Sequence, residues 1–176
     1  MEDVKCYDNF PKRIVILTVS YTVITYAIGA YLLACLPLGL IWSILYIAYV
    51  ILMEILILEK SCINCYYYGR LCGFGRGKLC ALLFKPGDPQ KFAAREATWR
   101  DILPDFLVLI FPVVGGIILL IQNFNVLPLV LLIVLVFLFL GGNPIIRGSF
   151  TCKFCKQREL GCPANKLFEK GKVKKT

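Results

Sequence analysis

Four long stretches of apolar residues constrain the fold of this 176-residue chain more than any other feature. A helix that crosses the hydrocarbon core of a membrane needs about 20 mostly apolar residues, and each stretch is long enough. Only Glu54 and Asp105 place a charge inside them. We therefore expect an all-α integral membrane protein with four transmembrane helices, at Ile14 to about Leu36, about Leu38 to Leu58, about Ile102 to Ile121, and Val126 to about Ile146.

The composition excludes several other classes of protein. Hydrophobic residues make up 59% of the chain and charged residues 18%, which is too apolar for a disordered chain or a small disulfide-stapled secreted domain. The first apolar stretch is also longer than the core of a signal peptide. The chain has no histidine, which excludes Ser-His-Asp and Cys-His catalysis, histidine-based zinc enzymes and histidine-ligated haem.

The basic residues determine the expected orientation. All 20 Lys and Arg residues lie before the first stretch, between the second and third, or after the fourth, and the turns at 36–37 and 122–125 have none. Loops that carry Lys and Arg are retained in the cytoplasm. We therefore expect a multi-pass protein of the cell membrane with both termini cytoplasmic. The net charge of +9 follows from this topology and does not require a nucleic-acid partner.

The turns between the apolar stretches pair the helices into two hairpins. Pro37 with Gly39, and Asn123 with Asn125 and Pro128, are typical of turns and helix starts. The expected organisation is a cytoplasmic N-terminal segment, a first hairpin, a cytoplasmic Cys-rich loop with an amphipathic helix, a second hairpin and a cytoplasmic Cys-rich basic tail. These five parts cover residues 1–13, 14–58, 59–101, 102–146 and 147–176.

The chain also contains an internal repeat. Cys62, Cys65 and Cys72 follow the first hairpin with the spacing C-x2-C-x6-C, and the same spacing recurs 90 residues later at Cys152, Cys155 and Cys162. Each copy has an even number of spans, so both copies enter the membrane in the same direction. We therefore expect two pseudo-symmetric modules related by an axis along the membrane normal, as in other parallel repeats.

The cysteines are the candidate metal ligands. C-x2-C lets a tight turn direct two thiolates at one ion, and two more thiolates complete a tetrahedral site. The first loop supplies a full set of four, and the second supplies three, to which the N-terminal segment can add Cys6. The predicted ligands are therefore Cys62, Cys65, Cys72 and Cys80 at one site and Cys152, Cys155, Cys162 and Cys6 at the other. Cys35, at the opposite end of a span, is interpreted as a packing residue.

The spacing leaves the identity of the metal open. Without histidine a site is all-sulfur, which suits an iron–sulfur cluster or zinc. The Cys162-Pro163 pair resembles the end of bacterial ferredoxin motifs, although the spacing before it differs. Redox-active or disulfide-bonded cysteines and unliganded thiols are the remaining interpretations. We expect no haem and no nucleotide, because the glycine-rich segment 73–78 lacks the spacing of a phosphate-binding loop.

Several other residues have two interpretations. Glu54, near the end of the second span, is either a functional intramembrane carboxylate or a side chain that extends to the interface. Asp88 followed by Pro89 predicts the start of an amphipathic surface helix that leads into the third span. The tyrosines at 66–68 either shield a metal site from water or lie at the membrane interface.

The leading functional hypothesis is an iron–sulfur electron-transfer or assembly subunit in the membrane. Its partners would be the lipid bilayer and other membrane or cytoplasmic subunits, and we do not expect an enzyme from this chain alone. A zinc-stabilised docking scaffold is the alternative. A small transporter is a third hypothesis, against which the scarcity of polar residues in the spans argues. The sequence identifies no site for a lipid-soluble electron carrier.

Overall fold

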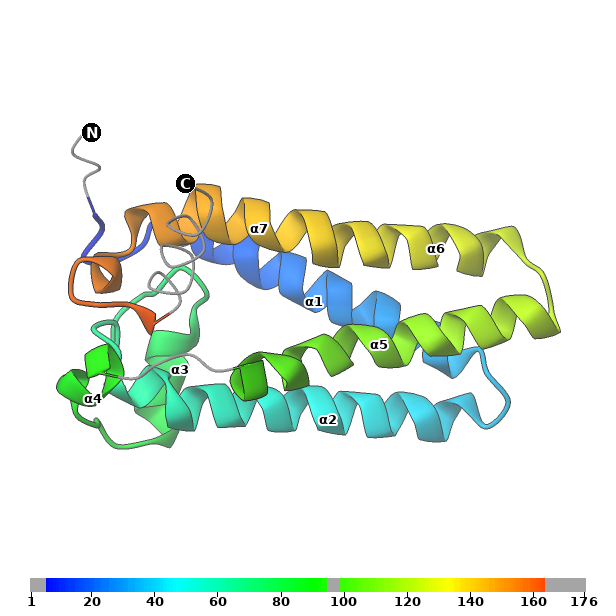
Figure 1. Ribbon diagram of the computed structural model, residues 1–176, viewed down its shortest axis with the longest axis horizontal. Coiled ribbons are helices and arrows are strands. Elements are labelled where there is room, and N and C mark those ends of the chain that lie inside the picture. Colours follow the sequence, from blue (N-terminus) through cyan, green and yellow to red (C-terminus); the bar gives the residue numbers. More distant parts are fainter. Residues whose placement is uncertain (1–5, 95–98, 164–176) are drawn as a thin grey trace.

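The computed structural model describes residues 6–94 and 99–163, and within these ranges the chain is helical with no strand. Four of its helices are long and apolar enough to cross a membrane, as the sequence predicts. They run roughly side by side along the long axis of the molecule (Figure 1). The three remaining described segments, residues 6–11, 61–94 and 151–163, gather at one end of this bundle, which we call the loop end (Figure 1).

The first hairpin consists of α1 (Lys12–Ala34) and α2 (Gly39–Lys60). The turn between them places Leu38 in the left-handed region at φ 58°, which is strained for a residue with a branched side chain. Gly39 follows because a Cβ there would overlap the carbonyl of Ala34, so the helices can turn back within four residues. After α2 come the 3-10 turn η1 (Cys62–Asn64), α3 (Arg76–Leu83) and α4 (Pro89–Ala94).

The second hairpin consists of α5 (Trp99–Gln122) and a long helix that starts with α6 (Val126–Phe137). Asn125 caps α6 by accepting a hydrogen bond from the backbone N–H of Leu127 at 3.0 Å, as expected of a helix start. The helix continues as a π-helical segment, α7 and a second π-helical segment, which are η2 (Leu138–Gly142), α7 (Asn143–Ile145) and η3 (Ile146–Thr151). Two 3-10 turns follow, η4 (Cys152–Phe154) and η5 (Lys156–Arg158).

The π-helical segments widen the fourth helix, and Pro144 explains why they form. Pro144 has no N–H, so it cannot donate to the carbonyl four residues earlier, and the helix loosens around it. Gly142 lies in the same stretch, and a Cβ there would approach the Tyr21 ring to 2.8 Å. The hydroxyl of Tyr21 donates a hydrogen bond to the carbonyl of Leu138. The widened helix and α1 therefore lie in direct contact.

A proline also interrupts the backbone hydrogen bonds of α5, the third of the four long helices. Pro112 lies inside α5 and leaves the carbonyl of Val108 without its helical donor. The hydroxyl of Tyr46 on α2 donates to this carbonyl at 3.2 Å, and Tyr46 is 4% exposed. Tyr46, Val108, Leu33 and Val50 form the apolar core between the two hairpins. The gap that proline leaves in one helix is therefore filled by a side chain of another.

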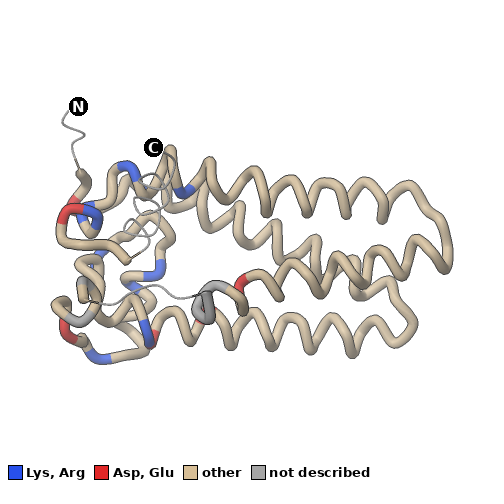
Figure 2. Tube along the Cα trace, viewed as in Figure 1, with Lys and Arg blue, Asp and Glu red and all other residues tan. Residues whose placement is uncertain are grey.

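Most of the helical surface faces outward. In the most apolar window of each spanning helix, at most 28% of the residues are buried inside the protein. The outward residues are predominantly large and aliphatic, which a lipid environment accommodates and water does not. Lys, Arg, Asp and Glu lie at the loop end and on the adjoining turns of the helices, while the opposite end of the bundle is uncharged (Figure 2). Charged residues that cluster along the sequence therefore also cluster in space, toward one end of the bundle.

The predicted surface helix is present in part. Asp88 caps α4, because its Oδ1 accepts a hydrogen bond from the N–H of Gln90 at 2.9 Å. Residues 95–98, through which this helix was expected to reach the third span, lie outside the described residues, so its continuation stays a prediction. Most of the basic tail, residues 164–176, also lies outside them.

Candidate metal centre and the adjoining cavity

The cysteine-bearing segments meet at the loop end. All nine cysteines are described, and none is in a disulfide bond. Eight lie at the loop end, in its loops, its turns and α3, and the exposed Cys35 lies alone at the opposite end, where it caps the C-terminus of α1. We call the eight the cysteine layer: Cys6, Cys62, Cys65, Cys72, Cys80, Cys152, Cys155 and Cys162.

The two C-x2-C segments have the same backbone conformation. Each is a 3-10 turn in which the second cysteine donates its N–H to the carbonyl of the first, at 3.2 Å for Cys65 and 3.3 Å for Cys155. Each is followed by a second matching bond, from Tyr68 N to Cys65 O and from Arg158 N to Cys155 O, both 3.0 Å. Residues 90 positions apart thus form the same turns.

Glycines shape the backbone around Cys72. The N–H of Gly77 donates to the Cys72 sulfur at 3.3 Å, which is the kind of bond that stabilises a thiolate. Gly75 adopts φ +72° immediately before α3, a conformation that favours glycine. A Cβ on Gly77 would overlap the carbonyl oxygens of Tyr67 and Arg70. The glycine-rich segment therefore folds tightly next to a cysteine.

The N-terminal segment lies beside the second cysteine loop. Tyr7 donates its N–H to the carbonyl of Phe154 at 3.0 Å and forms a parallel bridge with Cys155. Cys6 interacts with Glu159 of the same loop, and burial together with this carboxylate raises the pKa of the Cys6 thiol. Cys6 thus lies beside the segment that carries Cys152 and Cys155, and its assignment to the second set of ligands stays a prediction.

The two loops also meet each other. Burial raises the pKa of Cys65 to about 11, and the neighbouring thiols of Cys72, Cys162 and Cys80 add to this rise. Burial raises the pKa of Cys155 to about 12, with contributions from Cys65, Cys152 and Cys162. Thiols from both repeats are therefore close enough to influence one another electrostatically.

Tyr67 joins the three segments of the cysteine layer. Its side chain is 2% exposed, and its hydroxyl donates to the carbonyl of Tyr7 at 2.6 Å. The same oxygen accepts the N–H of Lys156 at 2.9 Å. Next to it, the N–H of Tyr66 donates to the buried amide of Gln157 at 2.8 Å. The tyrosines thus hold the loops together.

The arrangement of the thiols differs from that of a completed metal site. Among the described residues, no group of three or more His, Cys, Asp or Glu side chains lies in position to hold an ion. Cys80 is fully buried, and its sulfur contacts the carbonyl of Leu58 at 3.6 Å. The donor set has the chemistry that soft metals prefer, but the side chains would need to turn toward one another to bind one.

Glu54 forms an ion pair instead of extending alone to the interface. Its carboxylate accepts two hydrogen bonds from Arg76, from Nε at 2.7 Å and from Nη2 at 2.6 Å. Tyr26 on α1 donates a third at 3.1 Å. The pair connects α2 with the start of α3, four residues after Cys72, and so fixes the first cysteine loop against the membrane-spanning helices.

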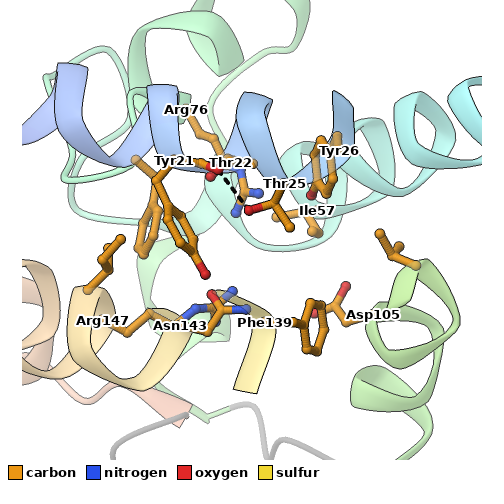
Figure 3. Close-up of a pocket in the computed structure, with 13 residues that line it drawn as sticks. Tyr21, Thr22, Thr25, Tyr26, Ile57, Arg76, Asp105, Phe139, Asn143 and Arg147 are labelled. Atoms are coloured by element: carbon orange, nitrogen blue, oxygen red, sulfur yellow. Dashed lines mark hydrogen bonds between the residues drawn. The ribbon is translucent and has the colours of Figure 1, made fainter. Parts of the chain in front are cut away.

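A cavity lined by both polar and apolar side chains lies between the helices next to this ion pair (Figure 3). Its lining comes from α1, α2, α3, α5, the 73–75 loop and the widened fourth helix. Figure 3 shows Tyr21, Thr22 and Thr25 on one side and Asn143 and Arg147 on the other. The hydroxyl of Thr25 is already engaged, because it donates to the carbonyl of Tyr21 at 2.8 Å.

The sequence did not predict this cavity. Thr22, Thr25 and Asn143 are isolated polar residues in apolar stretches, and nothing in their spacing shows that they face one another. The one available signal was the Asn143-Pro144 pair, which interrupts an otherwise apolar span.

The chain matches no protein-family model, no curated protein and no solved structure. We therefore infer a function from the residue types, contacts and burial of the site itself.

Proposed function

We propose that this protein is embedded in the membrane and holds thiolate metal sites on its cytoplasmic face, as an iron–sulfur electron-transfer or assembly subunit. The observation that carries the proposal is the convergence of eight cysteines from three separate segments into one layer beneath the helices. An all-thiol donor set in a reducing compartment favours a soft metal over a disulfide.

Two sites of four ligands fit the proposal. One takes Cys62, Cys65, Cys72 and Cys80, and the other takes Cys152, Cys155, Cys162 and Cys6. The repeated turns at 62–65 and 152–155 support an equivalent role for the two cysteine pairs, as does their offset of 90 residues. We infer that the two hairpins are related by an axis along the membrane normal and that both termini are cytoplasmic.

The raised pKa values of the thiols affect how such a site fills. Cys65 and Cys155 are protonated at neutral pH because burial raises their pKa values to about 11 and about 12. Each thiol must lose its proton to become a ligand, so metal binding releases protons and weakens as the pH falls. The N–H of Gly77 is placed to stabilise the thiolate of Cys72 once it forms.

The test is to purify the full chain anaerobically in detergent and to measure iron, acid-labile sulfide and zinc together with visible and EPR spectra. We expect bound iron and sulfide in a coloured protein. A colourless protein with stoichiometric zinc would overturn the electron-transfer hypothesis. A protein without either metal would overturn both metal hypotheses.

Cysteine variants provide matched controls. Cys72→Ser removes a proposed ligand and should reduce the metal content by about half, because one of the two sites is lost. Cys35→Ser makes the same chemical change at the opposite end and should leave the metal content unchanged. Equal metal content in the two variants would contradict the assignment of Cys72.

A zinc-stabilised docking scaffold is the second candidate. The observation that favours it is the hydrogen-bonding of Tyr67 to both Tyr7 and Lys156, which binds the loops into one surface. In that case the metal would serve stability only. Removal of zinc by a chelator should then lower the thermal stability of the protein, and redox titration should show no spectral change.

A further inference from the structure

We infer that the cavity between α1, α5 and the widened fourth helix binds the headgroup of a lipid-soluble quinone. The choice of a quinone rests on the proposed electron-transfer function, whereas the presence of a binding site rests on the cavity itself. Three features of the cavity support a ligand: polar groups that are not engaged, aromatic walls, and a position beside the cysteine layer.

Three side chains in the cavity have hydrogen-bonding capacity that the protein does not use. Asn143, Arg147 and Asp105 make no side-chain hydrogen bond with any described residue. By contrast, Tyr21 donates to Leu138 and Arg76 donates to Glu54. No buried side-chain nitrogen or oxygen among the described residues lacks a hydrogen-bond partner, so the unused groups of these three side chains are accessible at the cavity, where they can bind a polar ligand.

The unused groups match a neutral ligand with oxygen acceptors. Asn143 and Arg147 are four residues apart on one helix and lie together in the cavity (Figure 3), where both can donate to the same carbonyl oxygen. Asp105 lies apart from them near Phe139 (Figure 3) and brings a negative charge to the cavity. Arg76 and Arg147 also line the cavity, and Arg76 is already paired with Glu54. Asp105 therefore offsets the charge of Arg147, and a cavity with little net charge suits a neutral quinone headgroup better than a phosphate.

The walls suit a flat ring. Four aromatic side chains line the cavity, namely Tyr21, Tyr26, Phe74 and Phe139. Aromatic rings pack favourably against the face or edge of another planar ring. The cavity lies among membrane-spanning helices, so a ligand with an apolar tail can reach it from the bilayer.

The cavity is also next to the cysteine layer. Phe74 and Arg76 line it and lie two and four residues after Cys72. Phe74 contacts both arginines, since the guanidinium carbons of Arg76 and Arg147 lie 5.6 and 5.5 Å from its ring centre. A ring bound here would therefore lie against the same loop that carries a proposed metal ligand.

The test is saturation binding of a tritiated decyl-substituted benzoquinone to the full chain in phosphatidylcholine nanodiscs, with empty nanodiscs subtracted. We expect saturable binding at one site per chain. Asn143→Leu removes a donor and should weaken binding about tenfold, the effect of one lost hydrogen bond. Asn123→Leu makes the same change in the turn at the opposite end and should leave the affinity unchanged.

A second variant keeps the inference testable if Asn143→Leu fails to fold. Asp105→Asn preserves the shape of the side chain and removes its charge, so quinone affinity should change less than about threefold. Binding of phosphatidylglycerol that competes with the quinone and strengthens in Asp105→Asn would overturn the quinone assignment. Absence of saturable quinone binding, or equal affinity in the two asparagine variants, would overturn the site.

The same preparations separate this inference from the proposed function. Binding is measured on protein as isolated and on protein treated with a chelator, and the metal content is determined in both. Quinone binding to protein that contains no metal as isolated would support the cavity and overturn the proposed function, and unchanged binding after chelation would show that the cavity does not depend on a metal. Bound metal without quinone binding would support the proposed function and overturn the quinone site.

Discussion

Glu54 and Arg76 determine how the first cysteine loop is attached to the helices. Their side chains are 28% and 20% exposed, and the guanidinium donates two hydrogen bonds to the carboxylate. A bidentate pair of this kind is strong only while both partners are present, because one left alone is a charge in a poorly solvated site. Glu54 and Arg76 are 22 positions apart in the sequence. The position of Glu54 alone therefore did not indicate its partner, and it suggested a side chain extended to the interface.

We expect substitutions of Glu54 and Arg76 to have strongly non-additive effects on the free energy of unfolding. Glu54→Gln and Arg76→Gln should each lower the free energy of unfolding in detergent by about 3 kcal/mol, because each leaves its partner unpaired. The double variant should be less destabilised than the sum of the two by about 1–3 kcal/mol. Equilibrium unfolding followed by circular dichroism measures this, and additive effects would contradict the coupling.

At the scale of the helices, α5 is the element that depends most on its neighbours. Pro112 leaves the carbonyl of Val108 without a donor, and Tyr46 of α2 supplies one. Hydropathy could predict the length and apolar character of α5, because these depend on local composition alone. The partner of its free carbonyl could not be predicted, because that depends on the rotation of α2 about its own axis.

Removal of this one hydroxyl should therefore weaken the contact between the two hairpins. Tyr46→Phe leaves the carbonyl of Val108 unsatisfied and should lower the stability by about 1–2 kcal/mol. Tyr31→Phe is the matched control, since Tyr31 is 47% exposed and its change should have almost no effect. Thermal unfolding in the same detergent compares the two, and equal melting temperatures would count against the interhelical bond.

For the whole molecule, the segregation of charge is the feature that the sequence predicted most fully. Basic residues that cluster along the sequence also lie together in space, toward one end of four helices that can cross a membrane (Figure 2). The cysteine spacing likewise predicted two matching turns. The cavity could not be predicted, because its residues come from six parts of the fold and no short pattern connects them.

The proposed orientation, with both termini cytoplasmic, predicts which thiols an impermeant reagent can reach. Cys35 and Cys152 are both exposed but lie at opposite ends of the bundle. A membrane-impermeant maleimide added outside intact cells should label Cys35, and it should label Cys152 only after the membrane is permeabilised. Mass spectrometry of the labelled peptides identifies the sites, and labelling of Cys152 in intact cells would reverse the orientation.

The hydrogen bonds of Tyr67 have a consequence for biosynthesis. Its hydroxyl contacts Tyr7 and Lys156, so its partners lie near the beginning and near the end of the chain. During translation the first cysteine loop emerges from the ribosome well before Lys156, with the whole second hairpin still to be made. The layer therefore closes only after the fourth helix has been made, and until then its thiols stay accessible to a metal of the kind we propose.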